Sequence, residues 1–299
     1  MHKVDYLCNT ITYEPMTTIA QLRNEIKATI AETLTEETST LARDLICDTL
    51  DMSLTQLLMH SDDTLSDETV QEIRHKALRI RDNEPLQYVT GKAYFGGRIF
   101  KVNTSTLIPR PETEQLTSLI CQATPTDTPQ RILDIGTGSG CIAITLKCNM
   151  PHSTLHAIDI SEKALQQASA NALRHKADIT FERCDILNDT PSAENFDIVV
   201  SNPPYICESE RTSMADNVLL HEPHTALFVP DNDPLLFYRR IATLCLEENL
   251  LRKEGTLYFE INEAYGTQTK LLLENLGYAE CQILHDIYGK ERIVIAKKI

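Results

Sequence analysis

The sequence contains no apolar run long enough to cross a membrane, and residues 1–8 include an early acid and no apolar stretch of signal-peptide length. Membrane insertion and export are therefore not expected, and a cytoplasmic location is. The nine cysteines are scattered, odd in number and without a C-x-x-C pair. They predict reduced, mostly buried thiols instead of disulfides or a zinc site. The nine histidines lack metal-ligand spacing, so no metal is expected.

Positive charge is also scarce. The chain has 28 Lys and Arg against 43 Asp and Glu, a net charge of −15, and no long Lys/Arg run. Because such a surface repels a phosphate backbone, a direct nucleic-acid substrate is disfavoured. A basic patch assembled by folding from dispersed residues would be the exception. No internal repeat or low-complexity tract is present.

The first part of the chain carries short apolar stripes at three- and four-residue steps. This spacing predicts helices with one buried face, on Ile19, Leu22, Ile26, Ile30 and Leu34, then on Leu41, Leu45, Ile46 and Leu50, and then on Val70, Ile73, Ala77 and Ile80. Thr17 and Thr18 are available as caps. Since no catalytic constellation falls here, residues 1–84 are predicted to form a small helical bundle domain for substrate recognition or support.

A different pattern follows at residues 85–108. Paired glycines, Gly96 and Gly97, lie between β-branched and aromatic residues and predict a β-hairpin connector. Pro111 is then predicted to open a helix whose first turn holds Glu112 and Glu114. Residues 109–299 are expected to form the catalytic domain.

Beyond residue 130, strand and helix patterns alternate as in a doubly wound parallel sheet, so the fold class is α/β. Strands are predicted at 131–135, 155–160, 179–184, 197–201, 256–261, 281–285 and 292–296, with helices at 162–175, 234–250 and 263–276. The last two strands are too close for a helical crossover and should form an antiparallel hairpin. One strand of the seven-stranded sheet would then run against the others, unlike the sheet of a plain dinucleotide-binding domain.

The first of these strands runs into a glycine-rich turn, Asp134-Ile-Gly136-Thr137-Gly138-Ser139-Gly140. Glycines here let the backbone approach a ligand and expose amides at a helix amino terminus. The third glycine of a dinucleotide fingerprint is replaced by Cys141, which disfavours a nicotinamide cofactor.

The ends of the next two strands extend this candidate cofactor site. Asp159 can accept both hydroxyls of an unphosphorylated ribose, and Asp185 with Ile186 lies where an adenine would sit. Asp185 alone is explained equally well as a solvated strand-end acid. Together, the three strand ends predict a ligand with adenosine and a small zwitterionic tail, which matches S-adenosylmethionine, whose ammonium group would meet Asp134 or a nearby carbonyl.

Residues 202–205, Asn202-Pro203-Pro204-Tyr205, follow the apolar strand 196–201. Two prolines cannot continue a buried strand, so the chain must leave the sheet as a stiff extended loop. Its amide, carbonyls and aromatic ring suit an edge-on grip on a planar NH₂ group. Taken alone, an ordinary strand-terminating turn is an equally good explanation.

With both loops in view, the chain resembles the bacterial PrmC/HemK family over nearly its whole length. The resemblance is carried by residues 84–91, 107–114, 134–140, 201–206, 221–227 and 286–293. It implies a class I S-adenosylmethionine-dependent methyltransferase that modifies the side-chain amide nitrogen of the glutamine in the Gly-Gly-Gln motif of class 1 peptide-chain release factors.

The family's arrangement implies roles for the loop residues. The Asn202 side-chain oxygen and the Pro203 carbonyl would accept the two hydrogens of the substrate NH₂. Pro204 would stiffen the loop, and Tyr205 would pack against the glutamine. Asn202 is also expected to be one of the cofactor-binding residues. The chain departs from the family pattern at residues 227–235, which lack the expected glycines, and at Ala264-Tyr265, where a glutamine is usual. These departures concern loop shape.

Several alternatives stay open from sequence alone. A nucleic-acid adenine methyltransferase shares the Asn-Pro-Pro-Tyr motif, and a non-catalytic cofactor-binding module would keep the fold. Arg110 would either approach the ligands or pair with Glu112 or Glu114. Glu222 and His224 are interpreted as loop-packing residues in preference to an acid/base pair. The expected partners are release factors, with no nucleic acid or membrane, and the expected state is a monomer.

Overall fold

The computed structural model describes residues 17–34, 36–125 and 127–299. The chain divides into two compact units, with the boundary between Thr90 and Gly91, and each is described by itself. The prediction drawn from residues 1–8 lies outside the described residues. No helix in the described ranges is both long and apolar enough to span a membrane. Every cysteine within those ranges is a free thiol, and most are buried.

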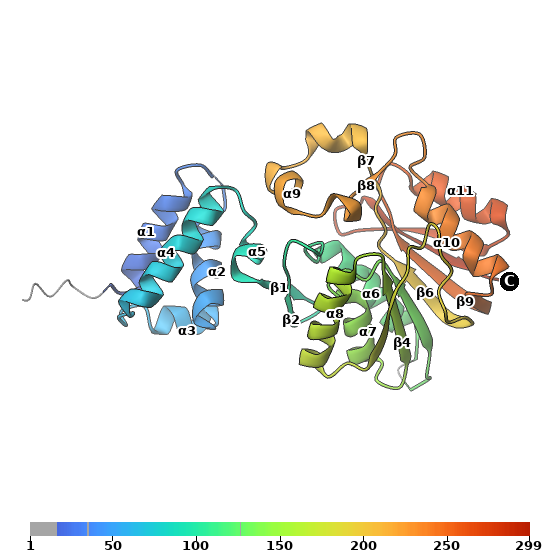
Figure 1. Ribbon diagram of the computed structural model, residues 1–299, viewed down its shortest axis with the longest axis horizontal. Coiled ribbons are helices and arrows are strands. Elements are labelled where there is room, and N and C mark those ends of the chain that lie inside the picture. The colour runs from blue at the N-terminus through green and yellow to red at the C-terminus, as the bar shows by residue number, and fades with distance from the viewer. Residues whose placement is uncertain (1–16, 35, 126) are drawn as a thin grey trace, which may run out of the picture. The chain divides into compact units, whose positions relative to one another are not determined.

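The first unit is helical, as predicted (Figure 1). It contains α1 (Ile19–Ile30), α2 (Thr38–Leu50), α3 (Leu54–Met59), α4 (Asp67–Arg81) and α5 (Leu86–Thr90). Helix α1 begins with a capping box, in which Thr18 Oγ1 accepts from the Gln21 N–H at 3.2 Å and Gln21 Oε1 accepts from the Thr18 N–H at 2.9 Å. The predicted apolar stripes pack into one core, so their helical spacing is confirmed.

The hairpin is shorter than residues 85–108. It consists of β1 (Lys92–Phe95) and β2 (Arg98–Lys101), whereas α5 is a helix that packs its apolar side chains into the core of the first unit. The aromatic and β-branched residues of α5 suggested a strand, but Leu86 and Val89 lie three residues apart and bury one helical face. Phe95 and Phe100 of the hairpin belong instead to a core of the second unit.

The second unit is built on a seven-stranded sheet in the order β10-β11-β9-β6-β3-β4-β5. The strands are β3 (Arg131–Ile135), β4 (Thr154–Asp159), β5 (Ile179–Arg183), β6 (Phe196–Ser201), β9 (Leu251–Glu260), β10 (Ala279–His285) and β11 (Glu291–Lys297). Strand β11 is antiparallel to both of its neighbours, and the other pairings are parallel. The predicted sheet with one reversed strand is confirmed.

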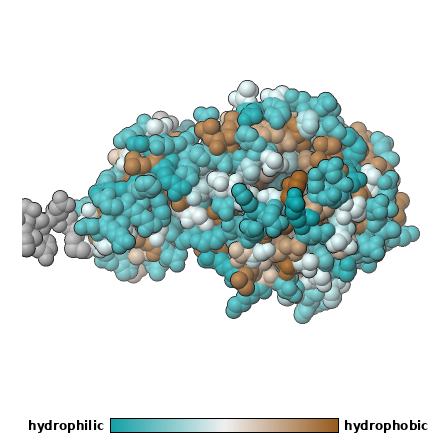
Figure 2. All heavy atoms as spheres, viewed as in Figure 1, coloured by the Kyte–Doolittle hydropathy of each residue, from teal (hydrophilic) through white to brown (hydrophobic). Residues whose placement is uncertain are grey.

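Helices cover both faces of this sheet because alternate strand residues point to opposite faces. Leu133 and Val199 pack in the core with α10 (Leu236–Glu247) and α11 (Gly266–Leu276), whereas Ile132 and Ile198 pack with α6 (Pro111–Ala123) and α7 (Cys141–Asn149). Helix α8 (Glu162–His175) contacts β4 and β5, and α6 begins at its predicted proline. The face shown in Figure 2 is mostly hydrophilic, with apolar residues scattered over it.

The carboxyl ends of the parallel strands meet at one edge of the sheet, where the loops that carry ligands gather in such folds. The longest excursion at this edge joins β6 to α10. It contains β7 (Ile206–Cys207), the 3₁₀ segment η1 (Glu208–Ser213), α9 (Asp216–His221), the 3₁₀ segment η2 (His224–Ala226) and β8 (Phe228–Val229). The pairing of β7 with β8 returns the chain to the residues that follow the Asn-Pro-Pro-Tyr loop.

Candidate active site

The glycine-rich turn wraps closely around the end of β4. The N–H groups of Gly136 and Thr137 both donate to the Ile158 carbonyl, at 2.9 and 3.0 Å. Gly136, Gly138 and Gly140 all have positive φ, which only glycine adopts without strain. At Gly140 a Cβ atom would also lie 2.9 Å from Ile144 Cδ1. The glycines are therefore required by the path of the chain, and the N–H groups of Gly136, Thr137, Gly138 and Gly140 are all bound by acceptors within the protein.

Asp134 is fully buried beneath this turn. Its Oδ2 accepts from the Thr137 hydroxyl at 2.7 Å and from the Ala143 N–H at 3.2 Å, while its Oδ1 is buried without a hydrogen-bond partner. Burial raises the pKa of the Asp134 carboxyl to about 7, against the opposing effect of those two hydrogen bonds. A buried carboxyl that has one unpartnered oxygen and a pKa near neutrality is suited to a cationic ligand group.

Asp159 ends β4 and braces the same turn. Its Oδ2 accepts from the Gly138 N–H at 2.9 Å and its Oδ1 from the Ser161 N–H at 2.9 Å. Burial raises the pKa of this carboxyl, and the backbone hydrogen bonds oppose that shift. Each oxygen still has a second lone pair, so the carboxylate is held in place with acceptor capacity to spare.

Asp185 and Ile186 follow β5. Asp185 Oδ1 accepts from the Leu187 N–H at 3.1 Å and its Oδ2 from Asn188 Nδ2 at 2.7 Å. Both oxygens thus shape a local turn, a contribution that the sequence did not suggest. Ile186 is buried in the core with α10 and offers an apolar contact.

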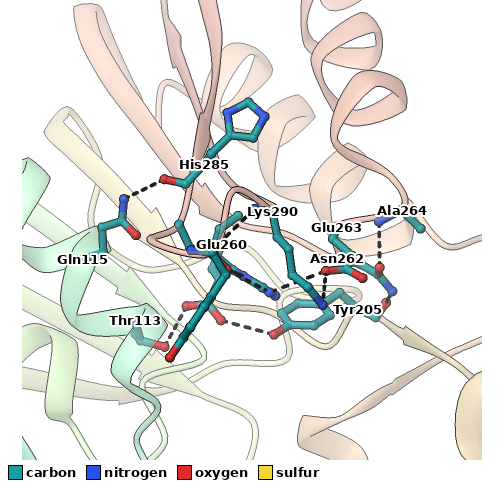
Figure 3. A network of polar contacts seen from close by, with 12 residues as sticks. Thr113, Gln115, Tyr205, Glu260, Asn262, Glu263, Ala264, His285 and Lys290 are labelled. Atoms are coloured by element: carbon teal, nitrogen blue, oxygen red, sulfur yellow. Dashed lines mark hydrogen bonds and ion pairs between the residues drawn. The ribbon is translucent and has the colours of Figure 1, made fainter. Parts of the chain in front are cut away.

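The loop Asn202–Tyr205 leaves β6 and is held by polar contacts. Figure 3 shows the contact of Tyr205 with Glu260. Asn202 Nδ2 donates to Thr113 Oγ1 at 3.2 Å, and the Tyr205 hydroxyl donates to Glu260 Oε1 at 3.2 Å. Asn262 Nδ2 donates to the Tyr205 carbonyl at 3.1 Å. The stiff exit predicted from the two prolines is therefore also fixed by side chains from α6 and from the end of β9.

Glu260 is the buried centre of this network, with 1% of its surface exposed. Burial raises the pKa of its carboxyl, while hydrogen bonds from Thr113 and Tyr205 and the charge of Arg292 act in the opposite direction. Burial likewise raises the pKa of the Tyr205 phenol, which keeps it a hydrogen-bond donor. Neither Thr113 nor Glu260 was predicted as a site residue; the available signal was a carboxylate directly after the apolar residues Tyr258 and Phe259.

Two cavities open at this edge of the sheet, with volumes of about 380 Å³ and 330 Å³. The lining of the first cavity includes these predicted residues: Gly136, Thr137, Gly138, Ser139, Asp159, Asp185, Ile186, Asn202, Pro203 and Pro204. Asp134, which is buried, and Gly140 are not part of that lining, and Tyr205 lines the second cavity. Asn202 and Pro203 line both. The loop therefore forms a shared wall between the cavities.

Arg110 has a different partner from the acids expected for it. Its guanidinium pairs with Glu222 Oε1 at 2.5 Å, and Glu222 Oε2 accepts from the Ile108 N–H at 3.2 Å. Pairing with Glu112 or Glu114 is therefore wrong, because the β6–α10 excursion brings Glu222 to the Arg110 guanidinium. In the described ranges, no group of His, Cys, Asp and Glu side chains is arranged to hold a metal ion.

Comparison with known protein families agrees with this geometry. Residues 110–229 match the model of the methyltransferase small domain, and residues 21–91 match that of the PrmC N-terminal domain. The seven-stranded sheet, its reversed strand and its glycine-rich turn make the second unit a class I methyltransferase domain.

Individual relatives narrow the class. The release factor glutamine methyltransferase of Bacteroides thetaiotaomicron is 45% identical over 281 residues, which covers 92% of this chain and 100% of the relative. Those of Flavobacterium psychrophilum and Enterococcus faecalis are 46% and 38% identical, covering 73% and 81% of this chain and 76% and 86% of the relatives. The chain belongs to the family of release factor glutamine methyltransferases, and the predicted resemblance to PrmC/HemK proteins is confirmed.

Proposed function

We propose that this chain transfers a methyl group from S-adenosylmethionine to the side-chain amide nitrogen of the glutamine in the Gly-Gly-Gln motif of class 1 peptide-chain release factors. The observation that carries the proposal is the shared wall formed by Asn202 and Pro203. A methyl donor in the first cavity and an amide in the second would meet beside the Asn202 side chain, which lines both cavities, as the Arg110 side chain also does. The relatives described above are named release factor glutamine methyltransferases.

The first cavity and the residue behind it have groups that suit S-adenosylmethionine. In the lining, the Asp159 carboxylate suits the ribose hydroxyls and the side chain of Ile186 suits the adenine. The unpartnered Oδ1 of Asp134, which precedes the lining residue Ile135, suits the ammonium group. The absence of any atom within 4 Å of a Cβ at Gly136 or Gly138 leaves room for a ligand against the backbone. When bound, the cofactor supplies an electrophilic methyl group.

Asn202 and Pro203 supply the hydrogen-bond acceptors that align a substrate amide nitrogen and stabilise the charge it develops. The lone pair of an amide nitrogen is delocalised into its carbonyl, so attack requires alignment and stabilisation of the positive charge that develops on nitrogen. The Asn202 side-chain oxygen and the Pro203 carbonyl accept the two N–H hydrogens and orient the face of the nitrogen toward the first cavity. These hydrogen bonds strengthen as nitrogen becomes positive, and Tyr205 packs against the glutamine side chain.

The net charge of −15 favours a protein acceptor over nucleic acid. We propose that the chain works as a monomer in the cytoplasm and that residues 1–84, as the predicted helical domain, provide a second contact for the release factor. A long protein substrate benefits from two contacts, since linked contacts raise the effective concentration of the reacting glutamine.

The acceptor is tested by incubating the protein with methyl-labelled S-adenosylmethionine and each of three substrates: a class 1 release factor, the same factor with its tripeptide glutamine changed to alanine, and duplex DNA. We expect label only on the intact release factor. Label on DNA would favour a nucleic-acid adenine methyltransferase, and cofactor binding without label on any substrate would favour a non-catalytic module.

Asp134 makes cofactor binding depend on pH. Its carboxyl has a pKa of about 7 in the free protein, and a cationic ligand favours its ionised form, so binding must release a proton below that pH. We expect the Kd for S-adenosylhomocysteine to be about tenfold lower at pH 8 than at pH 6, from the linkage of binding to one ionisation. Calorimetry at both pH values measures this difference. Asp134→Asn should bind more weakly with a flat pH profile; a flat profile for the unmodified protein would refute the assignment.

A further inference from the structure

A chain of hydrogen bonds runs from the buried carboxylate of Glu260 to the side chain of Asn202. Thr113, in the first turn of α6, lies between them and is 3% exposed. Its hydroxyl donates to Glu260 Oε2 at 2.6 Å and accepts from Asn202 Nδ2 at 3.2 Å. Figure 3 shows Thr113 and Tyr205 reaching Glu260 from different elements.

The direction of each hydrogen bond between Glu260, Thr113 and Asn202 is fixed by the number of protons that these side chains can donate. An ionised carboxylate only accepts, and a threonine hydroxyl has one proton. Because Thr113 donates that proton to Glu260, its oxygen is left to Asn202 as an acceptor. The Asn202 amide must therefore present Nδ2 to Thr113, which leaves Oδ1 as its remaining polar atom. Within the described ranges, Oδ1 accepts no hydrogen bond from the protein.

Glu260 holds the other end of the same loop directly. Its Oε1 accepts from the Tyr205 hydroxyl at 3.2 Å, and its backbone carbonyl accepts from the Tyr238 hydroxyl at 3.3 Å. The Glu260 carboxylate thus orients Asn202 indirectly, through Thr113, and it orients Tyr205 by a direct hydrogen bond. Its burial makes both hydrogen bonds stronger than they would be in water.

We propose that Glu260 is a positioning residue that acts through Thr113 to hold the Asn202 amide with Oδ1 available to the substrate NH₂. The inference rests on the proposed function, because it concerns which atom of Asn202 meets the substrate. A reversed amide would present N–H donors to the N–H donors of the substrate, and the hydrogen bond that orients the nucleophile would be lost.

Thr113→Val tests the relay because it removes the hydroxyl while nearly conserving volume. We expect kcat to fall about tenfold, the effect of one hydrogen bond, with the KM for the release factor and the Kd for the cofactor unchanged within about twofold. Thr113→Ser, which keeps the hydroxyl, should restore most of the loss. Thr117→Val is the matched control, since Thr117 is buried on the same helix and its hydroxyl donates only to the Glu114 carbonyl.

Glu260→Gln tests the same relay from its other end. Thr113 and Tyr205 donate to different oxygens of Glu260. A glutamine has an acceptor at only one of these two positions and a donor at the other, so in this geometry it accepts from only one of the two hydroxyls. We expect a fall in kcat at least as large as that of Thr113→Val, again without a change in cofactor Kd. If thermal melting shows that Thr113→Val does not fold, Glu260→Gln serves as the test of the proposal. Full kcat in folded Glu260→Gln would overturn the proposal.

A double-mutant cycle separates a relay from a general structural role. If Thr113 acts through Asn202, Thr113→Val should have no further effect on single-turnover methyl transfer in an Asn202→Ala background. Independent, multiplying losses would overturn the relay while leaving the role of Asn202 intact. Near-normal turnover of Asn202→Ala by itself would instead remove the role of the loop and the proposed function that depends on it.

Discussion

Asn202→Ala is expected to lower single-turnover methyl transfer about 100- to 1000-fold, the loss seen when one preorganised polar partner of a transition state is removed. The side chain lies in the wall shared by the two cavities and keeps Oδ1 free while Nδ2 is held by Thr113. Alanine removes the acceptor that strengthens as positive charge develops on the substrate nitrogen. Rapid-quench measurement with labelled cofactor and release factor gives the rate.

The cofactor Kd of Asn202→Ala should change only a few-fold, since the ribose and ammonium partners lie elsewhere in the first cavity. Asn149→Ala provides a control, because Asn149 is an exposed asparagine at the end of α7. It should transfer methyl groups at the normal rate. A single-turnover rate for Asn202→Ala close to that of this control would rule out the amide grip.

The parts of the fold that were predictable carry local signals. The strands at 131–135 and 179–183 are bounded by turns and helices with clear periodicity, and the predicted ranges agree with β3 and β5 within one residue. The glycine-rich turn was predictable because positive φ and close backbone approach demand glycine at fixed places. Two adjacent prolines likewise determine where β6 must end.

The contacts that complete the site carry no local signal. Thr113 meets Glu260 across 147 residues of sequence, and Arg110 meets Glu222 across 112. No periodicity links such pairs, because sheet order and the β6–α10 excursion bring them together. For Arg110 the sequence offered nearer acids, and the more distant one is its partner. Helix α5 was missed for another reason: its five residues contain too little pattern to separate a helical turn from a strand.

Asp159→Ala is expected to raise the Kd for S-adenosylmethionine about 100-fold or more. The carboxylate is fixed by the N–H groups of Gly138 and Ser161 and keeps a lone pair on each oxygen for the ribose hydroxyls. Two hydrogen bonds to a charged acceptor contribute about 1.5 kcal/mol or more each, and each 1.4 kcal/mol changes affinity tenfold. Isothermal calorimetry measures the Kd, and the rate at saturating cofactor should fall much less.

The control for Asp159→Ala must lose a comparable backbone contact without touching the first cavity. Asp197 meets this need, because its Oδ2 accepts from the Arg131 N–H at 2.6 Å at the amino ends of β3 and β6. Asp197→Ala should lower the melting temperature and leave the cofactor Kd unchanged. Asp159→Ala should weaken cofactor binding and nearly retain the rate of methyl transfer, whereas Asn202→Ala should do the reverse. An unchanged Kd in folded Asp159→Ala would reject the ribose assignment.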